Sequence, residues 1–250
     1  LSEIYDYLIF LSRERQLNTA SLARKIAAIR SFYRYLTSKA HLLEENPVQE
    51  LDSPRMKKTL PRYLTLEESL ALLDAVQGKN KERDYCILML FLNCGLRISE
   101  LVNLNVSDIQ DDTIRVLGKG NKERILYLND GCKAALESYL TVRAMLSLQH
   151  EPALFVSNRR TRITRAGIHK MVKKYLLTAG LDASKYSAHK LRHTAATLML
   201  QNGVDVRTLQ EVLGHDHLNT TQIYTHISSD DLKIAAKANP LADARQKKGS

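Results

Sequence analysis

The sequence is poor in the features that mark secreted, membrane-spanning and metal-bound proteins. Its three cysteines, Cys86, Cys94 and Cys132, form no CxxC pair. An odd number of such cysteines fits a reducing compartment and argues against a disulfide or zinc framework. The longest uninterrupted apolar stretch, Cys86 to Leu92, is far shorter than the roughly 20 residues of a membrane span. No charged-then-apolar leader opens the chain, so we expect a soluble, cytoplasmic protein.

Internal repeats and low-complexity tracts are also absent. The first residue is Leu1 rather than methionine and falls directly into a helical pattern, so we expect a segment to precede it. The 250 residues are 44% hydrophobic and 26% charged, which is typical of a globular chain with one large core or two smaller ones. Lys and Arg outnumber Asp and Glu by 37 to 27, giving a formal charge of +10. This excess indicates a polyanionic partner such as nucleic acid.

The apolar pattern divides the chain into two helical parts. A stripe with helical spacing over residues 20 to 37 predicts an amphipathic helix that carries Arg24, Lys25, Arg30 and Arg34 outside its apolar face. Pro54 and Pro61 then bracket a basic segment with almost nothing to bury, which is typical of a linker. We therefore expect a partial helical DNA-binding domain over 1–51, a linker over 52–62, a catalytic domain over 63–240 and a C-terminal tail over 241–250.

The second part is predicted to be mainly α with one small β-hairpin. Thr65 and Glu68 form a capping box before the first helix, and the Asn93-Cys94-Gly95 stretch ends a buried helix. The hairpin pairs 113–117 with 124–128 across a glycine-rich tip that contains Lys119. Further helices are expected over 97–104, 165–176 and 230–238.

Unusual polar residues gather after residue 186. Ser187 can cap a helix that carries His189, Arg192 and His193 on one face. Asp205 can cap a second helix, Val206 to Leu213, which His215 follows after Gly214; Tyr224 lies in a short helical segment beyond. A metal site is one interpretation, because His189 and His193 have i, i+4 spacing and His215-Asp216-His217 adds ligands, although no HExxH motif is present. A helix-turn-helix DNA reader is the second, and a phosphodiester site built from arginines, lysine, histidines and tyrosine is the third.

Three stretches resemble the signatures of the tyrosine recombinase family, and its Xer subgroup in particular. They are Gly95-Leu96-Arg97-Ile98-Ser99-Glu100-Leu101, Ala188-His189-Lys190-Leu191-Arg192-His193-Thr194-Ala195-Ala196, and Leu213-Gly214-His215 continuing through Thr220-Thr221-Gln222-Ile223-Tyr224-Thr225-His226. The resemblance extends over essentially the whole chain and implies a helical core-binding domain followed by a mixed α/β catalytic domain. It implies six active-site residues, which occur here in the family's order: Arg97, Lys119, His189, Arg192, His215 and Tyr224.

The chemistry of these residue types suits phosphodiester cleavage. The planar guanidinium groups of Arg97 and Arg192 match the non-bridging phosphate oxygens, on which charge grows in the transition state. Glu100 is expected to hold the Arg97 side chain. Tyr224 can attack phosphorus and remain as a 3′-phosphotyrosyl ester, so that rejoining needs neither ATP nor metal, and no cofactor is expected. The absence of a Walker A motif fits this.

Proton transfer and DNA binding complete the expected site. We expect Lys119 to protonate the departing 5′ oxygen, His189 to be the general base and His215 to donate to phosphate, with the two histidine roles exchangeable. Basic residues around 159–174 form a run denser than a solvated face needs. The residues expected to contact DNA in the second domain are Arg159, Arg160, Arg162, Arg165, Lys170, Lys173 and Lys174.

The resemblance implies a site-specific DNA recombinase that works as a homo-oligomer, or with a related recombinase, as a tetramer on two DNA sites. Strand exchange would pass through a Holliday junction, and chromosome segregation and DNA integration are both compatible roles. We expect the helix 230–238 to dock on a neighbouring protomer, with docking on its own domain as the alternative. A DNA-binding regulator and a relaxing topoisomerase remain the other candidate functions.

Overall fold

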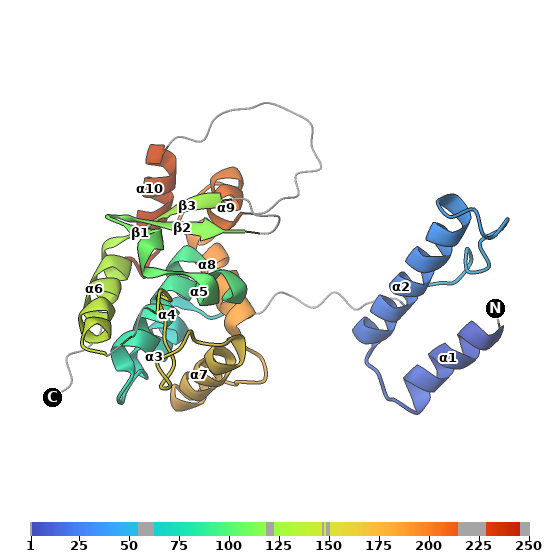
Figure 1. Ribbon diagram of the computed structural model, residues 1–250, viewed down its shortest axis with the longest axis horizontal. Coiled ribbons are helices and arrows are strands. Elements are labelled where there is room, and N and C mark those ends of the chain that lie inside the picture. Colours follow the sequence, from blue (N-terminus) through green and yellow to red (C-terminus); the bar gives the residue numbers. More distant parts are fainter. Residues whose placement is uncertain are drawn as a thin grey trace. The chain divides into compact units, whose positions relative to one another are not determined.

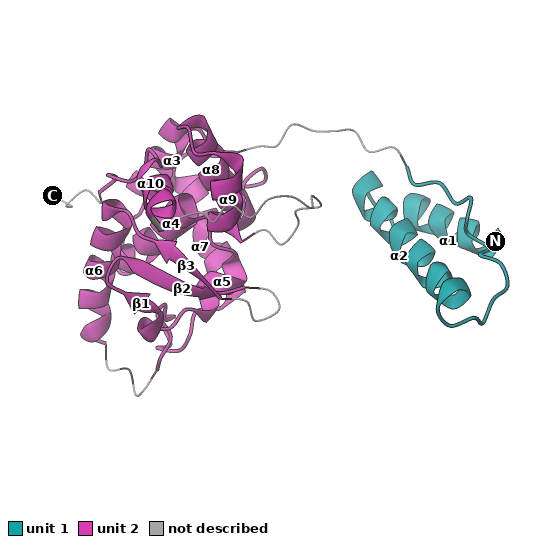
Figure 2. Ribbon diagram, turned by 90° about the horizontal axis from the view of Figure 1, so that it is seen from above, with its two compact units in different colours: residues 1–61 teal, residues 62–250 magenta. Residues whose placement is uncertain are grey.

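The computed structural model describes residues 2–54, 63–118, 123–146, 148, 151–214 and 229–245. The chain divides into two compact units, residues 1–61 and residues 62–250 (Figure 2). The boundary between the units falls inside the segment 52–62. Each unit has its own core, and each is described here by itself.

Unit 1 is a small helical unit. It contains α1 (Ser2–Arg13) and α2 (Thr19–Ser38), and Asn18 caps α2 by accepting a 2.9 Å hydrogen bond from the backbone N–H of Ser21. The amphipathic helix expected over 20–37 is thus confirmed. The core of the unit is formed by Leu8, Leu11, Ile26, Val48 and Leu51.

Unit 2 is built around a helix that is buried along almost its whole length. This helix, α4 (Lys81–Cys94), packs against α3 (Leu66–Asp74), α6 (Asp130–Ala144) and α8 (Ala188–Gln201) (Figure 1). Every residue of α4 from position 84 onward is buried. The capping box of Thr65 and Glu68 that begins α3 is confirmed. Gly95 ends α4 in the left-handed conformation, and the short helix α5 (Ile98–Asn103) follows.

A three-stranded antiparallel sheet lies beside these helices (Figure 1). The strands β1 (Ile109–Gln110), β2 (Thr113–Leu117) and β3 (Glu123–Tyr127) pair in the order β1-β2-β3, and the 3₁₀ helix η1 (Val106–Asp108) leads into them. The expected hairpin is therefore confirmed, and β1 is a strand that the sequence analysis did not anticipate. Ile114, Val116 and Leu126 face the core. The fold class, mainly α with a small sheet, is as expected.

The remaining helices of the described residues are α7 (Arg165–Thr178), α9 (Val206–Leu213) and α10 (Ser229–Lys237). Within the described ranges, no helix is both long and apolar enough to cross a membrane.

The helix α10 packs on its own unit in this structure, against α9 and β3. The side-chain amide of Asn129 donates to the carbonyl of Ala236 and to Asn93, at 3.1 and 2.8 Å, and Asn239 donates to the carbonyl of Leu92 at 2.9 Å. All three asparagines are buried, so these bonds are shielded from water. The segment is therefore firmly joined to the end of α4.

At the C-terminal end, Ile234 of α10 is 66% exposed, whereas Ala235 and Ala236 are buried. Residues 241–244, expected to be part of a tail, pack on unit 2: Leu241 is fully buried, and the carbonyl of Ala242 accepts a 2.6 Å hydrogen bond from the N–H of Gly131. The sequence pattern does not predict this packing, because the segment is too short to show a helical or strand periodicity of apolar residues.

Candidate active site

Arg97 lies at the start of α5, where Glu100 holds it in two ways. The backbone N–H of Arg97 donates to Glu100 Oε2 at 2.7 Å, and its Nη1 donates to Oε1 of the same carboxylate, also at 2.7 Å. The first bond caps the helix and the second fixes the guanidinium. The contact expected between Glu100 and Arg97 is therefore present.

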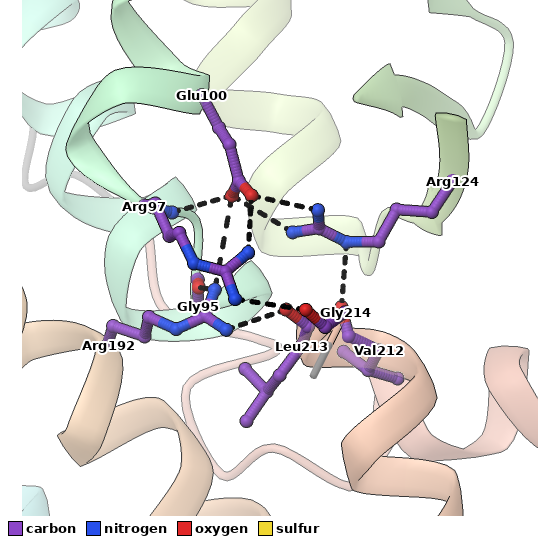
Figure 3. A network of polar contacts seen from close by, with 8 residues as sticks. All are labelled: Gly95, Arg97, Glu100, Arg124, Arg192, Val212, Leu213 and Gly214. Carbon is purple, nitrogen blue, oxygen red and sulfur yellow. Dashed lines mark hydrogen bonds and ion pairs between the residues drawn. The ribbon is translucent and has the colours of Figure 1, made fainter. Parts of the chain in front are cut away.

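Arg192 reaches the same place from α8. Its Nη1 donates to the carbonyl of Gly95 at 2.5 Å and its Nη2 to the carbonyl of Leu213 at 2.6 Å, while Nη2 of Arg97 donates to the next carbonyl, that of Gly214, at 2.9 Å. The two guanidinium groups thus meet at consecutive carbonyls at the end of α9 (Figure 3). Arg192 is 6% exposed, and the side chain of Arg97 is 38% exposed. One arginine is anchored in the core, and the other opens to solvent.

Two left-handed glycines allow this close approach. Gly95 has φ +59° and Gly214 has φ +62°, a conformation that other residues adopt only with strain. A Cβ atom on Gly95 would lie 2.5 Å from Cδ2 of Leu213, and a Cβ atom on Gly214 would lie 3.0 Å from Cδ of Arg124. Both helix ends therefore need glycine if the arginines are to bond the carbonyls beside them.

Arg124 on β3 is a third arginine of the cluster, and the sequence analysis did not single it out. Its Nη1 and Nη2 donate to Oε1 and Oε2 of Glu100 at 2.9 and 3.0 Å, and its Nε donates to the carbonyl of Val212 at 3.2 Å. The signal for it was present in the strand pattern. Arg124 alternates with Leu126 and Leu128, both buried, and so occupies an inward position of a half-buried strand.

The cluster combines three guanidinium groups with one buried carboxylate. Burial raises the pKa of Glu100, but the hydrogen bonds and charge of Arg124, together with the hydrogen bonds from Arg97, outweigh it and leave this pKa below its usual value. Burial, followed by the charge of Arg97, lowers the pKa of Arg192 to about 10, so Arg192 remains charged at neutral pH. Arg97, Arg124 and Arg192 against Glu100 give a local charge of 3 − 1 = +2. Such a site is suited to bind an anion.

His189 lies in the first turn of α8, on the surface. Partial burial, followed by the charges of His193 and Arg192, lowers its pKa below the usual 6.5, so its imidazole is neutral at pH 7 and can accept a proton. The rings of His189 and His193 lie 6.3 Å apart, centroid to centroid, at 79°. Among the described residues, no group of three or more His, Cys, Asp or Glu side chains is placed to hold a metal ion.

Three of the six expected active-site residues, Lys119, His215 and Tyr224, lie outside the described residues. Their neighbours in the chain are described. Lys119 belongs to the connection between β2 and β3, and His215 directly follows Gly214, whose carbonyl Arg97 binds. The structure therefore brings together Arg97, Arg192 and Glu100, with His189 on the same helix as Arg192.

The expected DNA-binding residues of unit 2 are of two kinds. Most of them are exposed and lie around the start and along the outer side of α7: Arg159, Arg160, Arg165, Lys170, Lys173 and Lys174. Arg162 differs, because its guanidinium donates to the carbonyls of Val102 and Leu104, at 2.8 and 3.1 Å, and to Oδ1 of Asn105 at 2.6 Å. The geometry gives Arg162 a structural part inside the unit.

The expected basic residues of unit 1 lie on α2, outside its buried stripe. Arg24, Lys25 and Arg34 are exposed, and Arg30 is half-buried with its Nη1 3.5 Å from the hydroxyl of Ser53. The buried residue of α2 is Ile26, so one side of the helix packs and the rest remains cationic.

Arg97 is held by a buried glutamate and Arg192 by backbone carbonyls, and such a fixed pair of guanidinium groups suits a protein that acts on phosphodiesters. Residues 62–230 match the phage integrase family, and the chain belongs to this family. It is a site-specific DNA recombinase of the tyrosine type.

The chain is similar to relatives of the Xer type. It is 52% identical to the tyrosine recombinase XerC of Caldanaerobacter subterraneus subsp. tengcongensis over 243 residues, which cover 97% of this chain and 69% of that protein. The crystal structure of XerA recombinase is 33% identical, with a TM-score of 0.59, over 93% of this chain and 80% of that one. XerH bound to palindromic difH, in a post-cleavage complex, is 26% identical, with a TM-score of 0.72, over 93% of this chain and 71% of that one.

Proposed function

We propose that Tyr224 is the nucleophile of the recombinase and that Arg97 and Arg192 hold the phosphate it attacks. The observation that carries this proposal is the paired arrangement of the two guanidinium groups, which bond consecutive carbonyls directly before His215. Each guanidinium keeps further N–H groups for a phosphate, because its five donors exceed the bonds that it makes within the cluster. Their fixed charge favours the transition state, in which the non-bridging oxygens carry more charge.

Proton transfer is assigned to the remaining members of the site. His189 accepts the tyrosyl proton, because its imidazole is neutral at pH 7, and His215 donates a hydrogen bond to the phosphate. Lys119 protonates the departing 5′ oxygen. The O–P bond to Tyr224 forms as the bond to the 5′ oxygen breaks, so the phosphoester is conserved and rejoining reverses the same step.

The partner is double-stranded DNA carrying a recombination site, as the difH complexes of XerH suggest. The exposed cations of α2 and α7 contact its phosphates, and they fix position rather than sequence. The protein acts on two sites as an oligomer, with strand exchange through a four-way junction.

Exchange of α10 between protomers belongs to this proposal. In the single chain α10 packs on its own unit, with Lys233 Nζ 5.4 Å from the ring centre of Tyr127. Tyr127→Cys together with Lys233→Cys tests the exchange with a bifunctional thiol cross-linker that spans about the length of the two side chains replaced. We expect a cross-link within the chain in DNA-free protein and cross-linked dimers in complexes on paired sites. Active complexes that contain only the cross-link within the chain would contradict the exchange.

The nucleophile is tested with Tyr224→Phe. This change deletes one oxygen, so we expect covalent attachment to DNA to be lost while DNA affinity remains nearly intact. The measurement is the protein–DNA adduct formed on a substrate nicked beside the cleavage site, in the presence of excess EDTA. An adduct formed by Tyr224→Phe would overturn the assignment, and loss of the wild-type adduct in EDTA would favour a metal site at His189, His193 and His215.

A further inference from the structure

Arg124 links three parts of the active site that come from distant places in the sequence. It is the second residue of β3, the strand that follows the hairpin tip. Its guanidinium bonds both oxygens of Glu100, 24 residues earlier, and the carbonyl of Val212, 88 residues later (Figure 3). Its side chain is 13% exposed. A buried arginine with all three nitrogens engaged in this way is held in a single position.

The carboxylate of Glu100 is bonded by two arginines, Arg97 and Arg124. Oε1 is shared by Nη1 of Arg97 and Nη1 of Arg124, and Oε2 is shared by the N–H of Arg97 and Nη2 of Arg124. Arg192 remains 3.9 Å from Oε2, and its short hydrogen bonds go to Gly95 and Leu213 instead. Arg124 thus neutralises the carboxylate and leaves Arg192 bound to the backbone.

Removal of Arg124 would change which groups Glu100 attracts. An ionised carboxylate in a buried site requires compensation, and Arg192 is the nearest charged group that does not yet bond it directly. Arg192 would then turn from the carbonyls of Gly95 and Leu213 toward Glu100. A bound phosphate would lose one of the two guanidinium groups that hydrogen-bond to it. The bond from Nε to Val212, which steadies the end of α9 just before Gly214 and His215, would be lost as well.

We infer that Arg124 is a positioning residue of the recombinase, an inference that rests on the proposed function. Arg124 fixes Glu100 and the end of α9, and this keeps the guanidinium groups of Arg97 and Arg192 oriented toward the phosphate. Arg124 itself does not touch the DNA. It affects the cleavage rate by positioning Arg97 and Arg192, and it does not affect proton donation by Lys119.

The test compares Arg124→Gln and Arg124→Lys with a matched control, Arg83→Gln. Arg83 makes the same kinds of contact near the start of α4, whose other end is at Gly95. It bonds the carboxylate of Asp84 and the carbonyl of Val156, and its side chain is also 13% exposed. Losing it therefore removes a similar structural contact at a distance from the site. Cleavage is measured in a single turnover at saturating DNA, together with DNA affinity and thermal unfolding.

We expect Arg124→Gln to slow cleavage by about 10- to 100-fold, the usual size of an outer contact that orients a binding group. DNA affinity should change by less than about threefold, since a single contact among many is disturbed. Arg124→Lys should recover part of the rate, because it keeps the charge and loses the fork. Arg83→Gln should lower thermal stability comparably and leave the cleavage rate of the folded protein as in the wild type.

Two results would overturn the inference. One is a cleavage rate for folded Arg124→Gln equal to that of Arg83→Gln, which would make the contact purely structural. The other is recovery of Arg124→Gln on DNA with a 5′-bridging sulfur, whose thiolate leaves without a proton, because that would route the effect through Lys119. Failure of the proposed function itself is distinguished by the adduct assay on Tyr224→Phe.

Discussion

Two sets of cations in unit 2 differ in how their side chains are held. Arg97 and Arg124 share the buried carboxylate of Glu100, and all three arginines, including Arg192, bond backbone carbonyls, so each has a fixed orientation. The cations along α7, such as Arg165 and Lys173, are exposed on the surface. A held guanidinium can discriminate between a ground state and a transition state, whereas an exposed one contributes charge and steering. Burial and bonding partners thus distinguish the cations suited to catalysis from those suited to attracting DNA.

Arg192→Lys is the change for which we expect the largest loss of cleavage rate. A lysine keeps the charge but cannot bond Gly95, Leu213 and a phosphate with one planar group. We expect cleavage at saturating DNA to slow by about 10²- to 10³-fold, as for the loss of one transition-state donor. Arg165→Gln should instead weaken DNA binding a few-fold and leave the saturated rate intact. Similar losses of rate in both variants would remove the distinction between the two sets.

Lys119→Ala tests a cation to which the proposed function gives a catalytic role and which follows β2 in the sequence. We expect cleavage to slow by on the order of 10²-fold or more, because a positioned general acid is lost. A substrate with a 5′-bridging sulfur should recover most of the rate, since its leaving group needs no proton. Without this recovery, Lys119 would be a phosphate contact that contributes to DNA affinity, as we expect of the exposed cations along α7.

The pH dependence of cleavage tests the neutral state of His189, which the held arginines help to impose. Its pKa is lowered, so cleavage at sub-saturating DNA should be level above pH 6.5 and fall about tenfold per unit below the pKa. Stability follows the same direction: the contribution of the neutral imidazole is full above the ordinary pKa and is lost as pH falls through the lowered one. His193→Gln should move the midpoint to higher pH, because it removes a charge that lowers this pKa. A midpoint unchanged in His193→Gln, or above 6.5 in the wild type, would argue against His189 as the base.

The smallest expected effects are those on salt dependence and stability, and they distinguish Arg162 from Arg159 and Arg160. Changing Arg159 and Arg160 together to Gln should flatten the dependence of log affinity on log salt by about 1 to 2. Arg162→Gln should leave that slope as it is and lower the free energy of unfolding by about 1–3 kcal/mol, because buried carbonyls lose their donor. Salt titration and urea unfolding measure the two quantities. A flatter slope for Arg162→Gln would return this residue to the DNA-contacting set.

Much of the fold follows from local patterns in the sequence. Thr65 with Glu68, Gly95 and Asp205 mark helix ends through contacts within three or four residues, and the sequence therefore predicts these boundaries correctly. The motif spacing also predicts the Arg97–Glu100 contact, which lies within one helical turn.

Contacts between distant residues could not be predicted in this way. The bonds of Arg124 to Glu100 and of Arg162 to Val102 depend on how separate elements pack, and a count of basic residues treats both arginines as surface charge. The burial of Leu241 has the same origin, since it requires the groove beside α4 and α6 to exist first. Local signals therefore define the elements, and packing decides which charged side chains become structural.

The closure of unit 2 by residues 241–244 has a consequence for synthesis of the protein. The backbone of Gly131 and the core around Leu241 are completed only by this late segment, and Asn239 must arrive to satisfy the carbonyl of Leu92 at the end of α4. When the ribosome has made the motifs around Arg97 and Arg192, the chain still lacks the residues that complete the core of unit 2. The packing that holds these two arginines is therefore expected to form only after residues 239–244 have left the ribosome.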